Sequence, residues 1–144
     1  MVVNTSNLFS ESYSEVTSFL KDNISDPRGR FKKQWVHPSM PNVNASGFNG
    51  YPFIIFSVDI GEQKKSFDAD TSEKVFRMLL SVYSDEATEI DSISDEIASN
   101  FKDETKLTSF KAREIASSPI TWNLDVNGKK VLTRDIGFIF RSRL

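Results

Sequence analysis

The sequence predicts an α+β protein: a mostly antiparallel sheet of four to five strands, with an N-terminal helix and a central acidic helix packed on one face and a β-hairpin at the C-terminus. Three observations predict this class. An apolar stripe with helical spacing begins the chain, the segment from Lys74 to Phe101 changes from a strand period to a helix period, and Asn127-Gly128 separates two alternating segments. We expect residues 1–144 to form a single domain.

The first expected element is a helix from Phe9 to Ile24. Ser6 or Asn7 can cap its start, and Asp26-Pro27 ends it because a residue before proline avoids the helical region. The apolar residues of this segment recur at intervals of one, three or four residues, which places them on one face: Phe9, Tyr13, Val16, Phe19, Leu20 and Ile24.

A long loop is expected over about residues 28–50. The segment has no sustained period and is rich in Pro, Gly and Asn. A short extended piece could form around Phe31, Trp35 and Val36. Loops of this length are uncommon inside a domain and are often functional, so a functional loop and a simple surface crossing both remain open.

Two strands are expected next, at Tyr51–Ile60 and Val75–Tyr83, with Pro52 at the first position or on an edge because it cannot donate to a sheet. Between them, Lys64–Asp68 could add a short strand before a turn at residues 68–72. An alternative joins residues 65–83 into one long strand with a bulge.

The acidic helix is expected to follow the second strand almost directly. Its apolar stripe consists of Ile90, Ile93, Ile97 and Phe101. Its other side carries the acids Glu89, Asp91, Asp95 and Glu96. A strand leading into an amphipathic helix is a scaffold unit with no catalytic group in it.

The C-terminal third contains the clearest local signal. Asn127-Gly128 predicts a hairpin between Ile120–Val126 and Lys130–Phe140, because both turn residues tolerate positive φ. The segment Lys106–Ala116 before it has no settled period, so a short helix and an irregular crossover both remain open.

Composition argues against several kinds of site. The chain has no Cys, a single His (His37) and a net charge of −2. These features argue against thiol chemistry and against a metal site, and no spacing typical of a nucleophile or a phosphate loop occurs, so we expect no enzyme activity and no cofactor. No apolar run approaches the roughly 20 residues that span a bilayer, so we expect no membrane partner.

The charges are distributed unevenly along the chain. A basic cluster lies in the loop, acids dominate the central helix, and bases dominate the C-terminus. The pattern is compatible with solvated faces or with a bipolar subunit whose acidic surface meets a basic surface on a neighbouring copy. Loop aromatics next to basic residues are also candidate contact residues. The candidate interface residues are Arg28, Arg30, Lys32, Lys33, Trp35, Phe48, Glu89, Asp91, Asp95, Glu96, Arg134, Arg141 and Arg143.

In the order of its elements the chain resembles the tail terminator (tail completion, or neck) proteins of long-tailed bacteriophages and related viruses. The matching pieces are the N-terminal helix, the loop leading to YPFIIFSVDI, the unit VFRMLLSVYSDEATEIDSISDEIASNF and the final SPITWNLDVNGKKVLTRDIGFIFRSR. This is a likeness of layout across most of the chain, without a diagnostic short motif.

The resemblance implies a structural role in the virion, assembled in the host cytoplasm. Copies of the chain would form a homo-oligomeric ring of six that sits on the major tail tube protein, halts tube growth and joins the head–tail connector protein. DNA would pass through the lumen only as cargo. The alternative from another class is a small nucleic-acid-binding module that uses the basic loop and the aromatic residues.

Overall fold

The computed structural model describes residues 8–30, 35–60, 64–65, 72–102 and 111–143. Two helices lie in this part of the chain, α1 (Leu8–Asn23) and α2 (Ala87–Lys102). The strands are β1 (Val36–His37), β2 (Phe53–Ile60), β3 (Lys64–Lys65), β4 (Ser72–Ser84), β5 (Lys111–Ser117), β6 (Thr121–Leu124) and β7 (Lys130–Arg143).

Within the described ranges, the seven strands form one mixed sheet that is mostly antiparallel. The order is β1-β2-β4-β7-β5, with β3 added to β4 and β6 added to β7. Only the pairing of β1 with β2 is parallel among these described pairs. The α+β prediction is confirmed. The count exceeds the expected four to five strands because β1 and β3, which are two residues each, join five longer strands.

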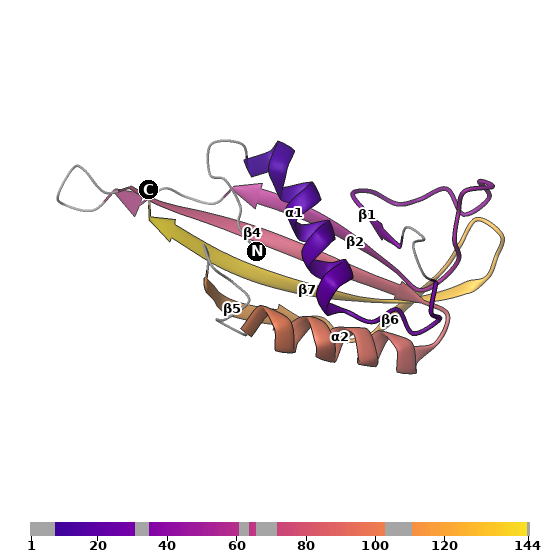
Figure 1. Ribbon diagram of the computed structural model, residues 1–144. Helices are drawn as coiled ribbons and strands as arrows, with labels where there is room; N and C mark the ends of the chain where they lie inside the picture. The colour runs from indigo at the N-terminus through magenta and orange to yellow at the C-terminus, as the bar shows by residue number, and fades with distance from the viewer. Residues whose placement is uncertain (1–7, 31–34, 61–63, 66–71, 103–110, 144) are drawn as a thin grey trace.

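Both helices pack on the same face of the sheet. In Figure 1, α1 crosses the strands while α2 runs alongside β7. The main core lies between them and the sheet, and alternation places Met78, Leu80 and Val82 of β4 in it. Ile90, Ile93, Ile97 and Phe101 are fully buried or nearly so, as the helical stripe predicts.

A smaller apolar cluster lies on the opposite face of the sheet. Tyr51, Phe53 and Val131 form its buried centre, and Phe48 and Tyr83 pack against it. The rings are in direct contact, with centroids 5.0 Å apart for Phe53 and Tyr83 and 5.4 Å apart for Tyr51 and Phe53. The loop after β1 therefore covers part of the face that the helices leave open.

Trp35 corrects the sequence prediction of an exposed contact residue. Its carbonyl oxygen accepts a hydrogen bond from the Ile54 amide at 2.8 Å, directly before the parallel pairing of Val36 with Ile54. This pairing brings the start of the loop onto the edge of β2, and the indole, 5% exposed, packs into the main core. Trp35 is a core residue.

The segment Lys106–Ala116, for which the sequence left both a short helix and an irregular crossover open, is partly a strand. Lys111–Ser117 forms β5, which pairs with β7. Its register shifts between Ala112 and Glu114, and this irregularity interrupts the two-residue period that identifies a strand. Residues 103–110 lie outside the described part of the chain.

The predicted C-terminal hairpin is confirmed, with a longer turn than expected. The Gly128 amide donates to the carbonyl oxygen of Asp125 at 3.0 Å, and the Asp125 amide donates to that of Lys129 at 2.8 Å. Gly128 has a φ of 76°, the left-handed conformation that glycine adopts most easily. The connection is thus a three-residue loop from Val126 to Gly128.

Candidate interaction surface

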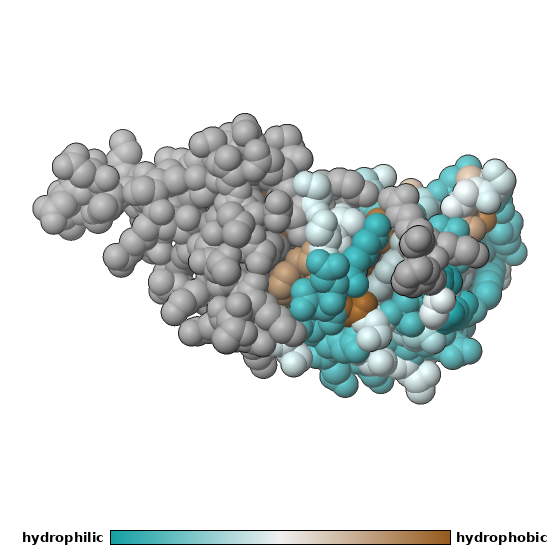
Figure 2. Space-filling model, viewed as in Figure 1, coloured by the Kyte–Doolittle hydropathy of each residue, from teal (hydrophilic) through white to brown (hydrophobic). Residues whose placement is uncertain are grey.

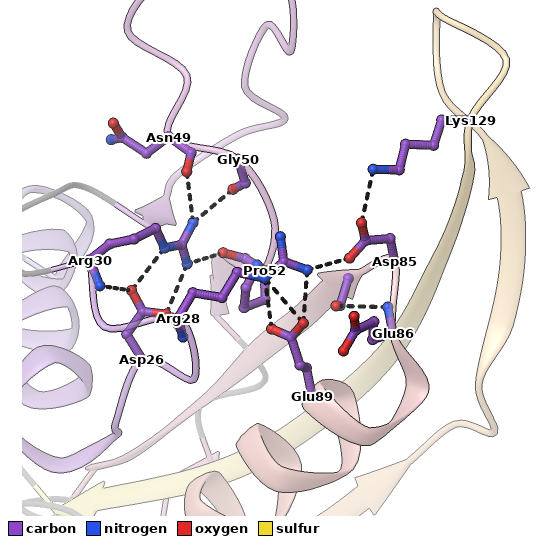
Figure 3. Close-up of polar contacts among 11 residues, drawn as sticks. Asp26, Arg28, Arg30, Asn49, Gly50, Pro52, Asp85, Glu86, Glu89 and Lys129 are labelled. Atoms are coloured by element: carbon purple, nitrogen blue, oxygen red, sulfur yellow. Dashed lines mark hydrogen bonds and ion pairs between the residues drawn. The ribbon is translucent and has the colours of Figure 1, made fainter.

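A network of charged side chains ties together one end of the fold (Figure 3). Arg28, in the loop after α1, forms a two-pronged contact with Glu89 at the start of α2. Its Nη2 lies 2.8 Å from Glu89 Oε1, and its Nε lies 3.1 Å from the same oxygen. Nη2 also bonds to Asp85 Oδ1. The hydrogen bond to Glu89 is the main cause that raises the pKa of the Arg28 guanidinium above its ordinary value.

Arg30 serves a different purpose in the same network. Its Nε donates to Asp26 Oδ2 at 2.8 Å, and its other nitrogens donate to the carbonyl oxygens of Asn49 (3.1 Å), Gly50 (2.8 Å) and Pro52. Burial alone would raise the pKa of Asp26. The bonds from the Arg30 side chain and from nearby amides outweigh that effect and hold this pKa below its ordinary value. Arg30 thus fixes the end of the long loop where it enters β2.

The hairpin joins this network through Lys129. Its Nζ lies 2.8 Å from Asp85 Oδ2, so Asp85 bridges Lys129 and Arg28. Burial would raise the pKa of Asp85, but the hydrogen bonds from Lys129 and Arg28 lower it overall. The loop after α1, the β4–α2 connection and the β6–β7 hairpin are therefore held in one arrangement.

These contacts change the interpretation of the charged candidates. Arg28 and Glu89 pair within the chain, and Arg134 Nη1 lies 2.8 Å from Asp91 Oδ1. Glu96 accepts a hydrogen bond at 2.8 Å from the amide of Ser25 in the loop after α1. The expectation of free acids awaiting bases on a neighbouring copy does not fit these three acids, because the fold brings a base of the same chain to Glu89 and Asp91 and a backbone amide to Glu96.

The remaining candidates have varied positions. Asp95 is exposed on α2. Phe48 is half-buried and meets Tyr51 and Phe53 edge-on, with centroids 5.7 and 5.8 Å away. Lys32 and Lys33 lie outside the described residues, as do the side chains of Arg141 and Arg143.

Large exposed hydrophobic side chains gather at the end of the sheet that carries the hairpin. They are Met40 (59% exposed), Trp122 (62%), Leu124 (57%) and Val126 (77%). Figure 2 shows small hydrophobic areas at this end of the molecule, and others nearer the centre of the view, among hydrophilic side chains. All four residues of β6 are exposed. The sequence pattern identified the alternation of Trp122, Leu124 and Val126 as a strand, but it could not show that this strand lies on an edge beyond the helices.

A cavity of about 320 Å³ opens beside these residues. Rings from the second apolar cluster line it, and the long loop and the hairpin form its two sides. Its principal lining residues are Met40, Val43, Tyr51, Phe53, Tyr83 and Val126. A volume at the low end of the range for ligand pockets suits one large apolar group.

Hydrogen bonds hold the two sides of the cavity together. Asn127 Nδ2 in the hairpin turn donates to Asn44 Oδ1 in the loop at 2.9 Å, and the Tyr51 hydroxyl donates to Asp125 Oδ2 at 3.2 Å. Burial, followed by the charge of Asp125, raises the pKa of Tyr51 to about 12. The Lys129 amide is the main cause that lowers the pKa of Asp125, so this side chain is a carboxylate at neutral pH.

Among the described residues, no group of three or more His, Asp or Glu side chains is placed to hold a metal ion. No helix in this part of the chain is long and apolar enough to cross a membrane. A scan of protein-family models gives no match for the sequence, and a search of curated proteins finds no significant similarity.

Proposed function

We propose that this protein is a structural subunit of the tail–head junction of a virus, and that its copies form a ring that caps the tail tube. The resemblance implies a ring of six copies. The observation that carries the proposal is the set of exposed apolar side chains at the hairpin end, with Met40, Leu124 and Val126 at the cavity and Trp122 on the other side of the hairpin. Large apolar side chains exposed at one end of a fold are typical of sites of protein association. The ring would halt tube growth and offer a surface to the head connector.

The architecture supports this class of subunit. The resemblance implies an antiparallel sheet with helices on one face, and the chain has that arrangement, with α1 and α2 on the same side. The two longest strands, β4 and β7, pair over twelve residue positions and form a stiff central ribbon. A subunit of this kind would act through shape and surface chemistry.

The alternative, a small nucleic-acid-binding module, loses three of the residues that suggested it. Arg28 and Arg30 are engaged by acids and by backbone carbonyls of the same chain. Trp35, a loop aromatic that follows the basic cluster, lies in the core.

The test is assembly with tail tubes of the same virus. The purified protein is analysed by native mass spectrometry and negative-stain microscopy, alone and mixed with tubes polymerised from the major tail protein. We expect rings and capped tube ends, and shorter tubes when the protein is present during polymerisation. A protein that leaves tube length unchanged and caps no ends at any salt concentration would contradict the proposal.

A further inference from the structure

We propose that Trp122 of one copy inserts into the cavity of the next copy, so that subunits associate head to tail through opposite faces of the hairpin. This inference rests on the proposed ring and names the contact that would build it. The occupant of the cavity is therefore a second copy of this chain.

The inserting side chain and the cavity lie on different sides of the same hairpin. Trp122 pairs with Leu132, which packs against the core beneath the helices. The next residue, Asn123, pairs with Val131, and both line the cavity on the other face. Leu124 and Val126, further along the hairpin, also line the cavity, but Trp122 does not. Because neighbouring residues of a strand point to opposite faces, Trp122 points away from the side of Asn123.

This arrangement determines the kind of assembly. A pair of copies joined by one insertion leaves one Trp122 and one cavity free. Such a heterologous contact continues from copy to copy and closes into a ring when the rotation permits. A two-fold dimer would instead need both insertions within one pair, each Trp122 entering the cavity of the other copy.

The chemistry of the two surfaces is complementary. The indole of Trp122 is 62% exposed, an unusual state for a side chain that typically anchors interfaces. The cavity presents the rings of Tyr51, Phe53 and Tyr83, suited to aromatic contact.

Charges add to this match. Lys130 Nζ lies 5.3 Å from the Trp122 ring centroid, so a cation accompanies the indole. The Asp125 carboxylate lies on the cavity wall, while Asp85 offsets the charge of nearby Lys129.

Strand addition at the edge of β6 is a weaker use of the same surface. The strand has four residues, and the Leu124 amide already donates to Asn123 Oδ1 at 2.8 Å. A partner strand would find a short edge with one of its donors occupied. Insertion of the Trp122 side chain needs neither a long strand edge nor a free backbone donor.

The experiment separates the two surfaces by mutation. Trp122→Ala removes the inserting group, and Val43→Trp fills the cavity, with Met40→Trp as a second filling variant. Leu79→Ala is the matched control, because Leu79 is an exposed apolar residue of β4 that does not line the cavity. Thermal melting first establishes that each variant is folded.

We expect Trp122→Ala and either filling variant to associate at least about 30-fold more weakly than the unmodified protein, measured by native mass spectrometry across a dilution series. Leu79→Ala should assemble normally. A mixture of Trp122→Ala with a filling variant should give one-to-one pairs and nothing larger, because only one intact contact is then possible. Trp122 emission should also shift to shorter wavelength on assembly of the unmodified protein.

Unchanged assembly of Trp122→Ala, or no pairing in the mixture of folded variants, would overturn the inference. If the unmodified protein still caps tubes in that case, the proposed function stands without this contact. If Trp122-dependent oligomers form but ignore tubes, the contact is correct and the tail function is wrong. A protein that stays monomeric at all concentrations refutes the contact.

Discussion

Replacing Arg28 with alanine removes the centre of the charged network. The side chain of Arg28 is 35% exposed, while those of its partners Glu89 and Asp85 are only 11% and 22% exposed. Without Arg28, the poorly hydrated carboxylates of Glu89 and Asp85 lose this cation. Lys129 is then the only counter-ion that the described contacts give to Asp85.

The expected cost lies between two limits. Exposed ion pairs contribute about 0.2–1 kcal/mol, whereas removing one partner of a buried pair costs about 3–5 kcal/mol. The intermediate exposure of this site suggests about 2 kcal/mol for Arg28→Ala at neutral pH. In a domain of this size that corresponds to a decrease of about 6 °C in Tm.

The assay is thermal and urea unfolding at pH 7, with Arg134→Ala as the matched control. Arg134 also pairs with an acid of α2, but its partner Asp91 is 57% exposed, so we expect a loss of about 0.5 kcal/mol. The extra cost at Arg28 should shrink as the pH falls below about 3.8, because Arg28 helps to lower the pKa of Asp85 and that contribution is lost when Asp85 is protonated. If both variants lose the same small amount, the network does not stabilise this end of the fold.

Three further predictions concern folding. Trp35→Ala should cost about 3–5 kcal/mol because it empties a core position, whereas Trp122→Ala should leave the free energy of unfolding of the monomer almost unchanged; equal losses would contradict the assigned burial. Gly128→Ala should cost about 1 kcal/mol because of its positive φ, while Gly47→Ala, with no positive φ and open space around it, should not; chemical denaturation measures both. Asp26 and Asp85 have lowered pKa values in the fold, so their carboxylates stabilise it fully above their unfolded pKa values near 3.8. Tm should therefore fall as the pH drops through that range, and Asp85→Asn should make this fall smaller. An unchanged slope of Tm against pH in that variant would show that Asp85 does not contribute.

Local periodicity was enough to identify the main elements. The alternation in Val75–Tyr83 and the stripe from Ile90 to Phe101 each depend on residues close in sequence, and both appear in β4 and α2 with the expected buried faces. The same method missed β5, because the register shift after Ala112 removes the regular period. Trp35 was misassigned because its burial depends on pairing with a strand about twenty residues later.

The candidate surface was harder to predict than the fold. Arg28 and Glu89 lie 61 residues apart, and only the packing of α2 beside the loop after α1 turns two opposite charges into an ion pair. The exposure of Trp122 has a similar origin, since β6 pairs with β7 past the region that the helices cover. A local pattern predicts which residues share a face, but it does not show which faces remain uncovered.

Hydrogen bonds and an ion pair hold the walls of the cavity in place. The cavity walls come from segments about 80 residues apart, and Asn44–Asn127, Tyr51–Asp125 and Lys129–Asp85 hold those segments in place within the chain. A site held in this way loses less conformational freedom when a partner side chain enters, and a smaller ordering cost leaves more of the contact energy for association. In the proposed assembly, the pair of Asp85 and Lys129 would thus act indirectly, by holding the hairpin wall of the apolar cavity that Trp122 of the next copy would fill.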